Sequence, residues 1–130
     1  MKKEILNSDK APAPVGPYSH AVRAGDMLFC SGQIPLDAKT GEVLKGSVGE
    51  QAELSLSNVK TLLEDFGLNL NAVLKTTVFL TDMSTFNEFN EVYSKYFNES
   101  KPARSCVAVK QLPKGVDVEV EVIAAFNLET

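Results

Sequence analysis

The alternation of valine with charged residues near the end of the chain is the strongest constraint on the fold. Residues 116–122 read Val-Asp-Val-Glu-Val-Glu-Val. Successive side chains of a β-strand point to opposite faces, so one face of this segment carries valine and the other carries Glu119 and Glu121. This pattern is typical of a strand with one face on a core. We therefore predict a strand over 116–126 whose acidic face lies away from the core.

A second short segment, residues 104–110, is the predicted partner of this strand. The turn residues Leu-Pro-Lys-Gly at 112–115 join the two segments, which favours an antiparallel hairpin. If the valine faces of both strands lie together, Arg104 and Cys106 fall beside the two glutamates, where a guanidinium could bind a carboxylate and a Glu could activate water. The alternative is a solvated sheet face with weak cross-strand ion pairs. A register slip of one residue would put Arg104 on the face opposite the acids.

Length, composition and charge define the class of protein. The chain has 130 residues, of which 44% are hydrophobic and 23% charged, which predicts one globular domain over 1–130. The net charge is −4 and no run of Lys or Arg exceeds two residues, so we expect no nucleic-acid partner. Apolar runs fall short of the ~20 residues of a membrane span and no signal peptide is indicated, so we expect a cytoplasmic protein with no membrane partner. One His and two Cys predict no metal site.

Two amphipathic helices are predicted between the strands. The first opens with a capping box at Ser47 and Glu50 and ends at Gly67. The second opens with another capping box, at Thr85 and Glu88. Apolar residues at helical spacing follow in the second helix, and we interpret them as core rather than as a binding site. They are Phe86, Phe89, Val92, Tyr93, Tyr96 and Phe97.

The remaining segments predict strands and complete the element order. Residues 1–17 predict a short edge strand and a Pro-rich entry, residues 18–24 and 27–33 a hairpin, and residues 73–81 a β-branched strand. The order β-β-β-α-β-α-β-β indicates the α+β class, with a mostly antiparallel sheet and both helices on one face. The uncovered face would be half polar and half apolar, which favours self-association.

Short motifs over nearly the whole chain carry a family resemblance. They are Gly16-Pro17-Tyr18-Ser19-His20-Ala21, Cys30-Ser31-Gly32-Gln33-Ile34-Pro35, Thr40-Gly41-Glu42-Val43, Ser57-Asn58-Val59-Lys60, residues 75–83, Phe89-Asn90-Glu91-Val92-Tyr93, Pro102-Ala103-Arg104-Ser105-Cys106, Leu112-Pro113-Lys114-Gly115 and Val118-Glu119-Val120-Glu121. Through these motifs the chain resembles the reactive intermediate deaminase family, the RidA/YjgF-like proteins. The resemblance implies a chorismate-mutase-like fold and a homotrimer with sites between subunits. It also implies cofactor-free hydrolysis of 2-imino or 2-enamino acids, such as 2-iminopropanoate and 2-iminobutanoate, to 2-oxo acids and ammonia.

The resemblance further implies roles for single residues. Arg104 binds the substrate carboxylate and Glu119 positions the attacking water. The implied lining of the substrate pocket is Tyr18, Ser31, Gly32, Asn90, Arg104, Cys106 and Pro113. No His or second Cys flanks Cys106, so we interpret this residue as pocket wall rather than nucleophile. His20, the only histidine, is the alternative base.

Three other functions stay open at this point. The first is a non-catalytic sensor or interaction module on the same trimeric fold, which would bind a small carboxylate without releasing ammonia. The second is a ribonuclease or translation inhibitor, an activity also associated with relatives of the family. The acidic charge balance argues against it, because phosphate contacts need Lys or Arg. The third is a holdase-like chaperone.

Overall fold

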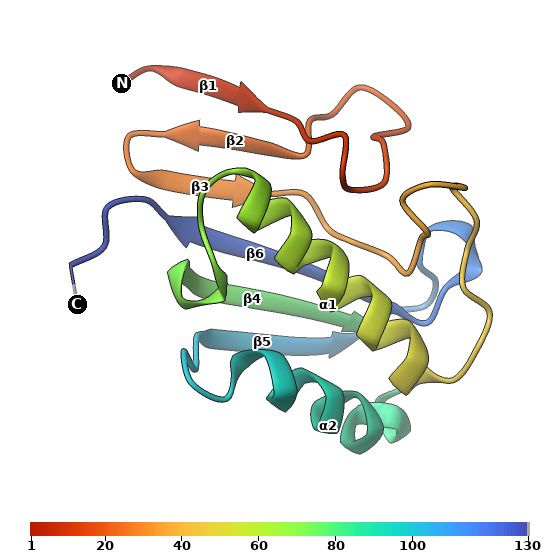
Figure 1. Ribbon diagram of the computed structural model, residues 1–130. Helices are drawn as coiled ribbons and strands as arrows, with labels where there is room; N and C mark the ends of the chain where they lie inside the picture. Colours follow the sequence, from red (N-terminus) through yellow and green to blue (C-terminus); the bar gives the residue numbers. More distant parts are fainter. Residues whose placement is uncertain (130) are drawn as a thin grey trace.

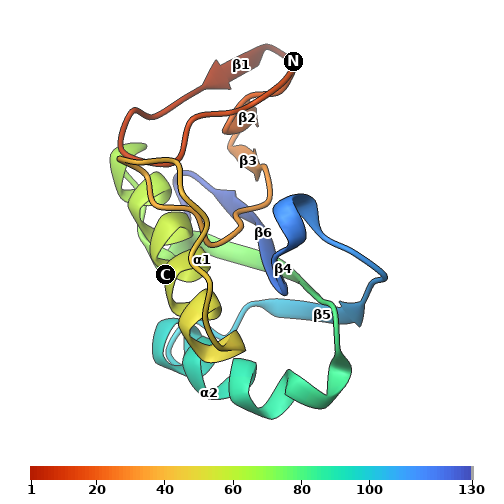
Figure 2. The same ribbon diagram turned by 90° about the vertical axis from the view of Figure 1, so that its right-hand side faces the viewer.

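A six-stranded sheet forms the centre of the molecule, in the order β1-β2-β3-β6-β4-β5 (Figure 1). The computed structural model describes residues 1–129, and Thr130, the end of the predicted domain, lies outside them. The strands are β1 (Lys3–Leu6), β2 (Ala21–Ala24), β3 (Met27–Cys30), β4 (Val73–Leu80), β5 (Ala103–Ala108) and β6 (Val118–Ala125). Helices α1 (Val48–Asp65) and α2 (Phe86–Phe97) cover one face, and the other face has no second layer over it in the described part (Figure 2). The predicted α+β class and element order are confirmed.

Strand β6 lies in the interior of the sheet, and its alternating side chains bury one of its faces. Val118, Val120 and Val122 are at most 2% exposed and pack beneath the helices. Glu119 and Glu121 are half-buried on the open face. The strand pairs antiparallel with β3 on one side and with β4 on the other.

The predicted hairpin between β5 and β6 is wrong. Strand β4 lies between them, antiparallel to β6 and parallel to β5. The reason is the crossover through α2, since a helix between two neighbouring strands returns the chain in the parallel direction. The 3₁₀ turn at Pro113–Gly115 then belongs to a longer connection that leads past β4 to the middle of the sheet.

The two predicted capping boxes have different outcomes. At the start of α1, the Glu50 amide donates to Ser47 Oγ at 3.2 Å and the Ser47 amide donates to Glu50 Oε1 at 3.0 Å, so this box is confirmed. At the start of α2, the Thr85 side chain caps nothing. The Glu88 carboxylate instead accepts a 2.7 Å hydrogen bond from the Gly49 amide, which ties the N-termini of the two helices together.

The aromatic stripe of α2 is core, as predicted. Phe89, Tyr93 and Phe97 are at most 7% exposed, and their successive ring centroids lie 5.8 and 4.8 Å apart. Helix α1 ends as predicted, with Gly67 in the left-handed conformation at φ +82°. Neither α1 nor α2 combines the length and the apolar character that crossing a membrane requires.

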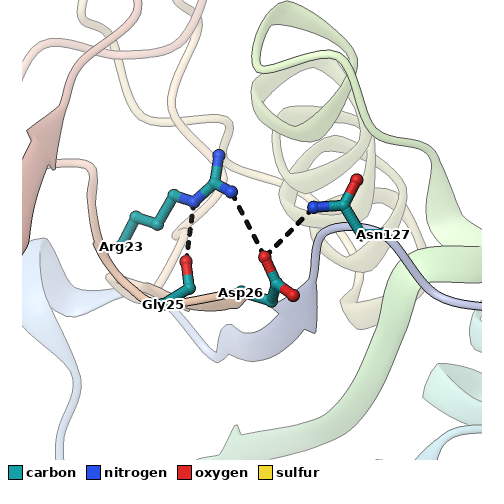
Figure 3. A network of polar contacts seen from close by, with 4 residues as sticks. All are labelled: Arg23, Gly25, Asp26 and Asn127. Atoms are coloured by element: carbon teal, nitrogen blue, oxygen red, sulfur yellow. Dashed lines mark hydrogen bonds and ion pairs between the residues drawn. The ribbon is translucent and has the colours of Figure 1, made fainter. Parts of the chain in front are cut away.

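A polar network fastens the end of β6 to the turn of the predicted β2–β3 hairpin, which is confirmed (Figure 3). Arg23 donates to the Gly25 carbonyl at 2.8 Å and lies 3.4 Å from the Asp26 carboxylate. The same carboxylate accepts from Asn127 at 3.1 Å, and the Phe126 amide donates to the Asp26 carbonyl at 2.7 Å. This network secures the register of β3 and β6 at the end remote from Glu119.

Candidate functional site

Glu119 lies on the open face of the sheet, directly against the backbone of Gly32. A Cβ atom built on Gly32 would be 2.9 Å from Cδ of Glu119, closer than real Cβ contacts come. The absence of a side chain at Gly32 is therefore what admits the carboxylate. In the ladder, Phe79 of β4 is the neighbour of Glu119.

Backbone hydrogen bonds hold the segment 31–33 beside the start of β6. The Ser31 amide donates to the His20 carbonyl at 2.9 Å, and Ser31 Oγ donates to the Ser19 carbonyl at 2.6 Å. Gln33 and Val120 exchange two backbone hydrogen bonds of 2.8 and 3.1 Å. The position of Glu119 relative to this segment is thus set by main-chain pairing.

A cavity of about 530 Å³ opens beside Glu119. Several residues implied by the resemblance line it: Tyr18, Ser31, Gly32, Pro113 and Glu119. We call this group the Glu119 half-site. Apolar side chains complete the lining, together with His20, Gln33, Lys114 and Glu121.

The carboxyl group of Glu119 is shifted toward its neutral form. Burial raises its pKa, and the negative charge of Glu121 on the same face of β6 raises it further. A carboxyl group with a raised pKa can take up and return a proton closer to neutral pH.

Arg104 lies on a different side of the molecule. Its Nη1 donates to Asn90 Oδ1 at 2.7 Å, and its Cζ lies 4.6 Å from the Tyr93 ring centroid. A hollow of about 400 Å³ opens beside these three residues, and we call them the Arg104 half-site. They come from β5 and from α2.

Arg104 and Glu119 point to opposite faces of the sheet, contrary to the prediction. Arg104 is the ladder neighbour of Thr76, which is buried under the helices, whereas Glu119 neighbours Phe79 on the open face. Cys106 is the ladder neighbour of Val78 and lies on the same face of β5 as Arg104. The assumed register paired β5 with β6 directly, and the intervening β4 removes that pairing. Within one described chain, the two half-sites therefore lie on opposite faces of the sheet and do not form one site.

Neither cysteine has the environment of a reactive thiolate. Burial raises the pKa of Cys106, and the charge of Arg104 only partly offsets this effect. Burial raises the pKa of Cys30 to about 12. Both thiols are therefore neutral at physiological pH, which argues against Cys106 as a nucleophile. Cys106 is not among the residues that line the hollow beside Arg104 or the cavity beside Glu119.

His20 has both ring nitrogens engaged in structure. Nδ1 accepts from the Ser8 amide at 2.9 Å, so Nε2 carries the proton and donates to the Pro12 carbonyl at 2.7 Å. The ring is 2% exposed. These bonds make His20 an anchor for the N-terminal segment, and they leave no free nitrogen for a base.

The helical spacing of apolar residues predicts Tyr93 as core but does not indicate its contact with Arg104. Tyr93 is core, yet its ring also faces the guanidinium. The spacing of Asn90 and Tyr93 on one helix turn was the available signal. Among residues 1–129, no group of three His, Cys, Asp or Glu side chains is placed to hold a metal ion.

Comparison with known proteins places this geometry in a family. The family described as "Endoribonuclease L-PSP" matches residues 8–126. A RutC family protein of Pyrococcus abyssi is 51% identical over 124 residues, covering 95% of this chain and 98% of the relative. An Escherichia coli protein named "Putative reactive intermediate deaminase TdcF" is 46% identical over 125 residues, covering 94% and 96%.

Solved structures agree with the sequence comparison. A protein of Thermotoga maritima is 50% identical and superposes with a TM-score of 0.93, covering 98% of this chain and 100% of that chain. Escherichia coli TdcF with bound serine is 44% identical with a TM-score of 0.88, covering 95% and 99%. The resemblance seen in the motifs is confirmed, and the chain belongs to the endoribonuclease L-PSP family, the RidA/YjgF-like proteins.

Proposed function

We propose that this protein is a cofactor-free deaminase that hydrolyses small 2-imino acids to 2-oxo acids and ammonia. The proposed active form is a homotrimer, in which Arg104 of one subunit and Glu119 of a neighbouring subunit face the same cleft. The observation that carries the proposal is the division of the site into halves on opposite faces of the sheet. A neighbouring copy can supply the half that each face lacks.

The open face of the sheet supports self-association. Phe29 and Val107 are 48% and 43% exposed there, beside the half-buried Phe79 and Ile123. Exposed apolar surface of this kind favours an interface. In a closed ring of identical subunits, each copy offers one surface to one neighbour and a different surface to the other. Every cleft would then receive one Arg104 half-site and one Glu119 half-site.

The proposed chemistry needs only one cation and one carboxyl group from the protein. Arg104 pairs with the substrate carboxylate and fixes the position of the imine carbon. Glu119 takes a proton from water as the water oxygen bonds to that carbon, and then delivers a proton to the nitrogen. The hydroxyl proton next moves to nitrogen through Glu119 while the C–N bond breaks. Ammonia leaves, the C=O bond forms, and Glu119 returns to its starting state.

Turnover of freshly generated imines tests the activity. We expect the wild type to accelerate ammonia and 2-oxo acid release from 2-iminopropanoate and 2-iminobutanoate, and Arg104→Ala not to. Binding of the 2-oxo acid without any acceleration would contradict the deaminase and support the carboxylate-sensing module.

Subunit mixing tests the shared cleft. Arg104→Ala alone should be inactive, and Glu119→Gln alone should keep at most about one hundredth of the wild-type kcat. Random mixed trimers of the two, after unfolding and refolding together, should regain about one quarter of wild-type activity, because about a quarter of clefts join two intact halves. No regain in mixtures shown to contain both variants would contradict a site between subunits.

A further inference from the structure

The guanidinium of Arg104 is held by side chains of one helix face. Asn90 accepts from Nη1 at 2.7 Å, the Tyr93 ring centroid lies 4.6 Å from Cζ, and the Phe86 ring centroid lies 5.3 Å from it. The three residues are four and three positions apart in α2, so they lie on one face of the helix. No other side-chain hydrogen bond of Arg104 occurs within residues 1–129. The edge formed by Nε and Nη2 is therefore left for a carboxylate.

Tyr93 is itself held in place by a buried hydrogen bond. Its hydroxyl shares a 2.8 Å hydrogen bond with Thr76 Oγ1, and the two residues are 7% and 0% exposed. Thr76 is the ladder neighbour of Arg104 on β4. The buried hydrogen bond therefore connects the strand beside Arg104 to the ring that supports the guanidinium.

We infer that Tyr93, through its hydrogen bond to Thr76, and Asn90 are positioning residues that set the orientation of the Arg104 guanidinium. This inference rests on the proposed function for the identity of the ligand, a 2-imino or 2-oxo acid carboxylate. It assigns Asn90 to Arg104 rather than to the substrate contact that the family resemblance implied. The orientation of the guanidinium matters because this group binds a carboxylate through two parallel hydrogen bonds.

Removing the buried hydrogen bond from either end tests the inference. Tyr93→Phe and Thr76→Val should each raise the KM for the imino acid and the Kd for the 2-oxo acid about fivefold, the loss expected for one neutral hydrogen bond. The kcat should change less. Asn90→Ala should shift the same constants by about tenfold, because its bond involves a charged donor.

A matched control lies one turn further along the same helix. Tyr96 donates to Glu53 Oε1 at 2.6 Å, away from Arg104. Tyr96→Phe therefore removes a hydroxyl hydrogen bond from α2 without changing a residue of the Arg104 half-site. We expect less than about a twofold change in KM for this variant. Because Tyr93→Phe and Thr76→Val remove the same bond, the double variant should lose no more than either single variant.

Several results would overturn the inference. Tyr93 would have only a packing role if Tyr96→Phe and Tyr93→Phe shifted KM and Kd equally, or if the losses in the double variant were additive. The same conclusion would follow if Tyr93→Phe lowered the thermal stability and left KM and Kd unchanged. The guanidinium NMR signals of Arg104 separate this failure from failure of the proposed function. They should report hindered rotation in the wild type and in Tyr96→Phe and faster rotation in Tyr93→Phe, whether or not any imine is hydrolysed.

Discussion

The two half-sites are built in different ways. Arg104 projects from an edge strand, is exposed, and is oriented by the side chains of Asn90 and Tyr93. Glu119 lies on a central strand, is half-buried, and owes its place to the bare backbone of Gly32. A guanidinium stays charged at any physiological pH and so tolerates solvent, whereas a proton-transferring carboxyl group needs burial to shift its pKa. Under the proposed function, ligand binding and proton transfer would therefore be carried out by two separate parts of the chain, on opposite faces of the sheet.

The largest expected effect separates these two tasks. Arg104→Ala should abolish both turnover and 2-oxo acid binding, because losing the partner of a charged carboxylate costs on the order of 2–5 kcal/mol. Glu119→Gln should lower kcat by about 10²–10⁴-fold and leave binding nearly intact. Calorimetric titration with 2-oxobutanoate beside turnover assays measures both. Loss of binding in Glu119→Gln would show that the two half-sites do not divide the work in this way.

Gly32→Ala should have an intermediate effect. The added methyl group would displace the Glu119 carboxyl group, and a displacement of about 1 Å is enough to lower kcat by about 10²-fold. Binding through Arg104 should change little. Gly25→Ala is the control, since its Cβ would meet no atom within 4 Å and its cost comes only from φ of +60°. If Gly25→Ala lowered kcat equally, general destabilisation rather than the contact with Glu119 would explain the result.

Glu121→Gln should produce a smaller change, in the pH dependence of kcat/KM. Glu119 must be ionised to accept a proton from water, so activity rises as pH rises through its raised pKa. Removing the charge of Glu121 lowers that pKa, and the rising limb should move to lower pH by less than about one unit. Lys114, which lines the same cavity, remains in place. If the rising limb moved no further in Glu121→Gln than in the control Glu4→Gln, another group would control the pH profile.

The smallest expected effect is a gain in stability for Glu119→Gln. A carboxyl group whose pKa is raised in the folded state is destabilising above that pKa, and the penalty disappears below the pKa of the unfolded chain. The variant should therefore melt about 1–3 °C above the wild type at neutral pH and level with it in acid. Differential scanning calorimetry at both pH values checks the sign. A lower Tm at neutral pH would contradict the raised pKa.

Patterns within one segment predicted the elements well. The valine alternation of residues 116–122 placed Glu119 and Glu121 together on the face away from the helices. Ser47 and Glu50 marked the start of α1, and Gly67 its end. Each of these signals depends on residues near one another in sequence, where strand and helix geometry apply directly.

Pairing between segments was not readable from the same patterns. Strand β5 carries Arg104 and Cys106 on one face and Ser105 and Val107 on the other, and Val107 lies on the open face, so its alternation does not say which face meets the core. The parallel pairing with β4 follows from the crossover, a long-range property. Glu88 does not complete a capping box, because its carboxylate accepts a hydrogen bond from the amide of Gly49 in the other helix. The residues of each half-site were therefore identified, while their division between the faces was not.

The anchoring of β6 at the β2–β3 turn has a practical consequence for attaching tags. Lys3 pairs opposite Ala24, and the Phe126 amide is bonded to Asp26, so β1 and the segment after β6 lie beside the same turn. Glu119 lies six residues before Ala125 at the other end of β6, about 20 Å away at the usual strand rise. Affinity tags of different kinds can therefore extend from either terminus without crossing the Glu119 half-site. If the protein forms the proposed trimer, mixed trimers of known composition could then be isolated by sequential capture on the two tags.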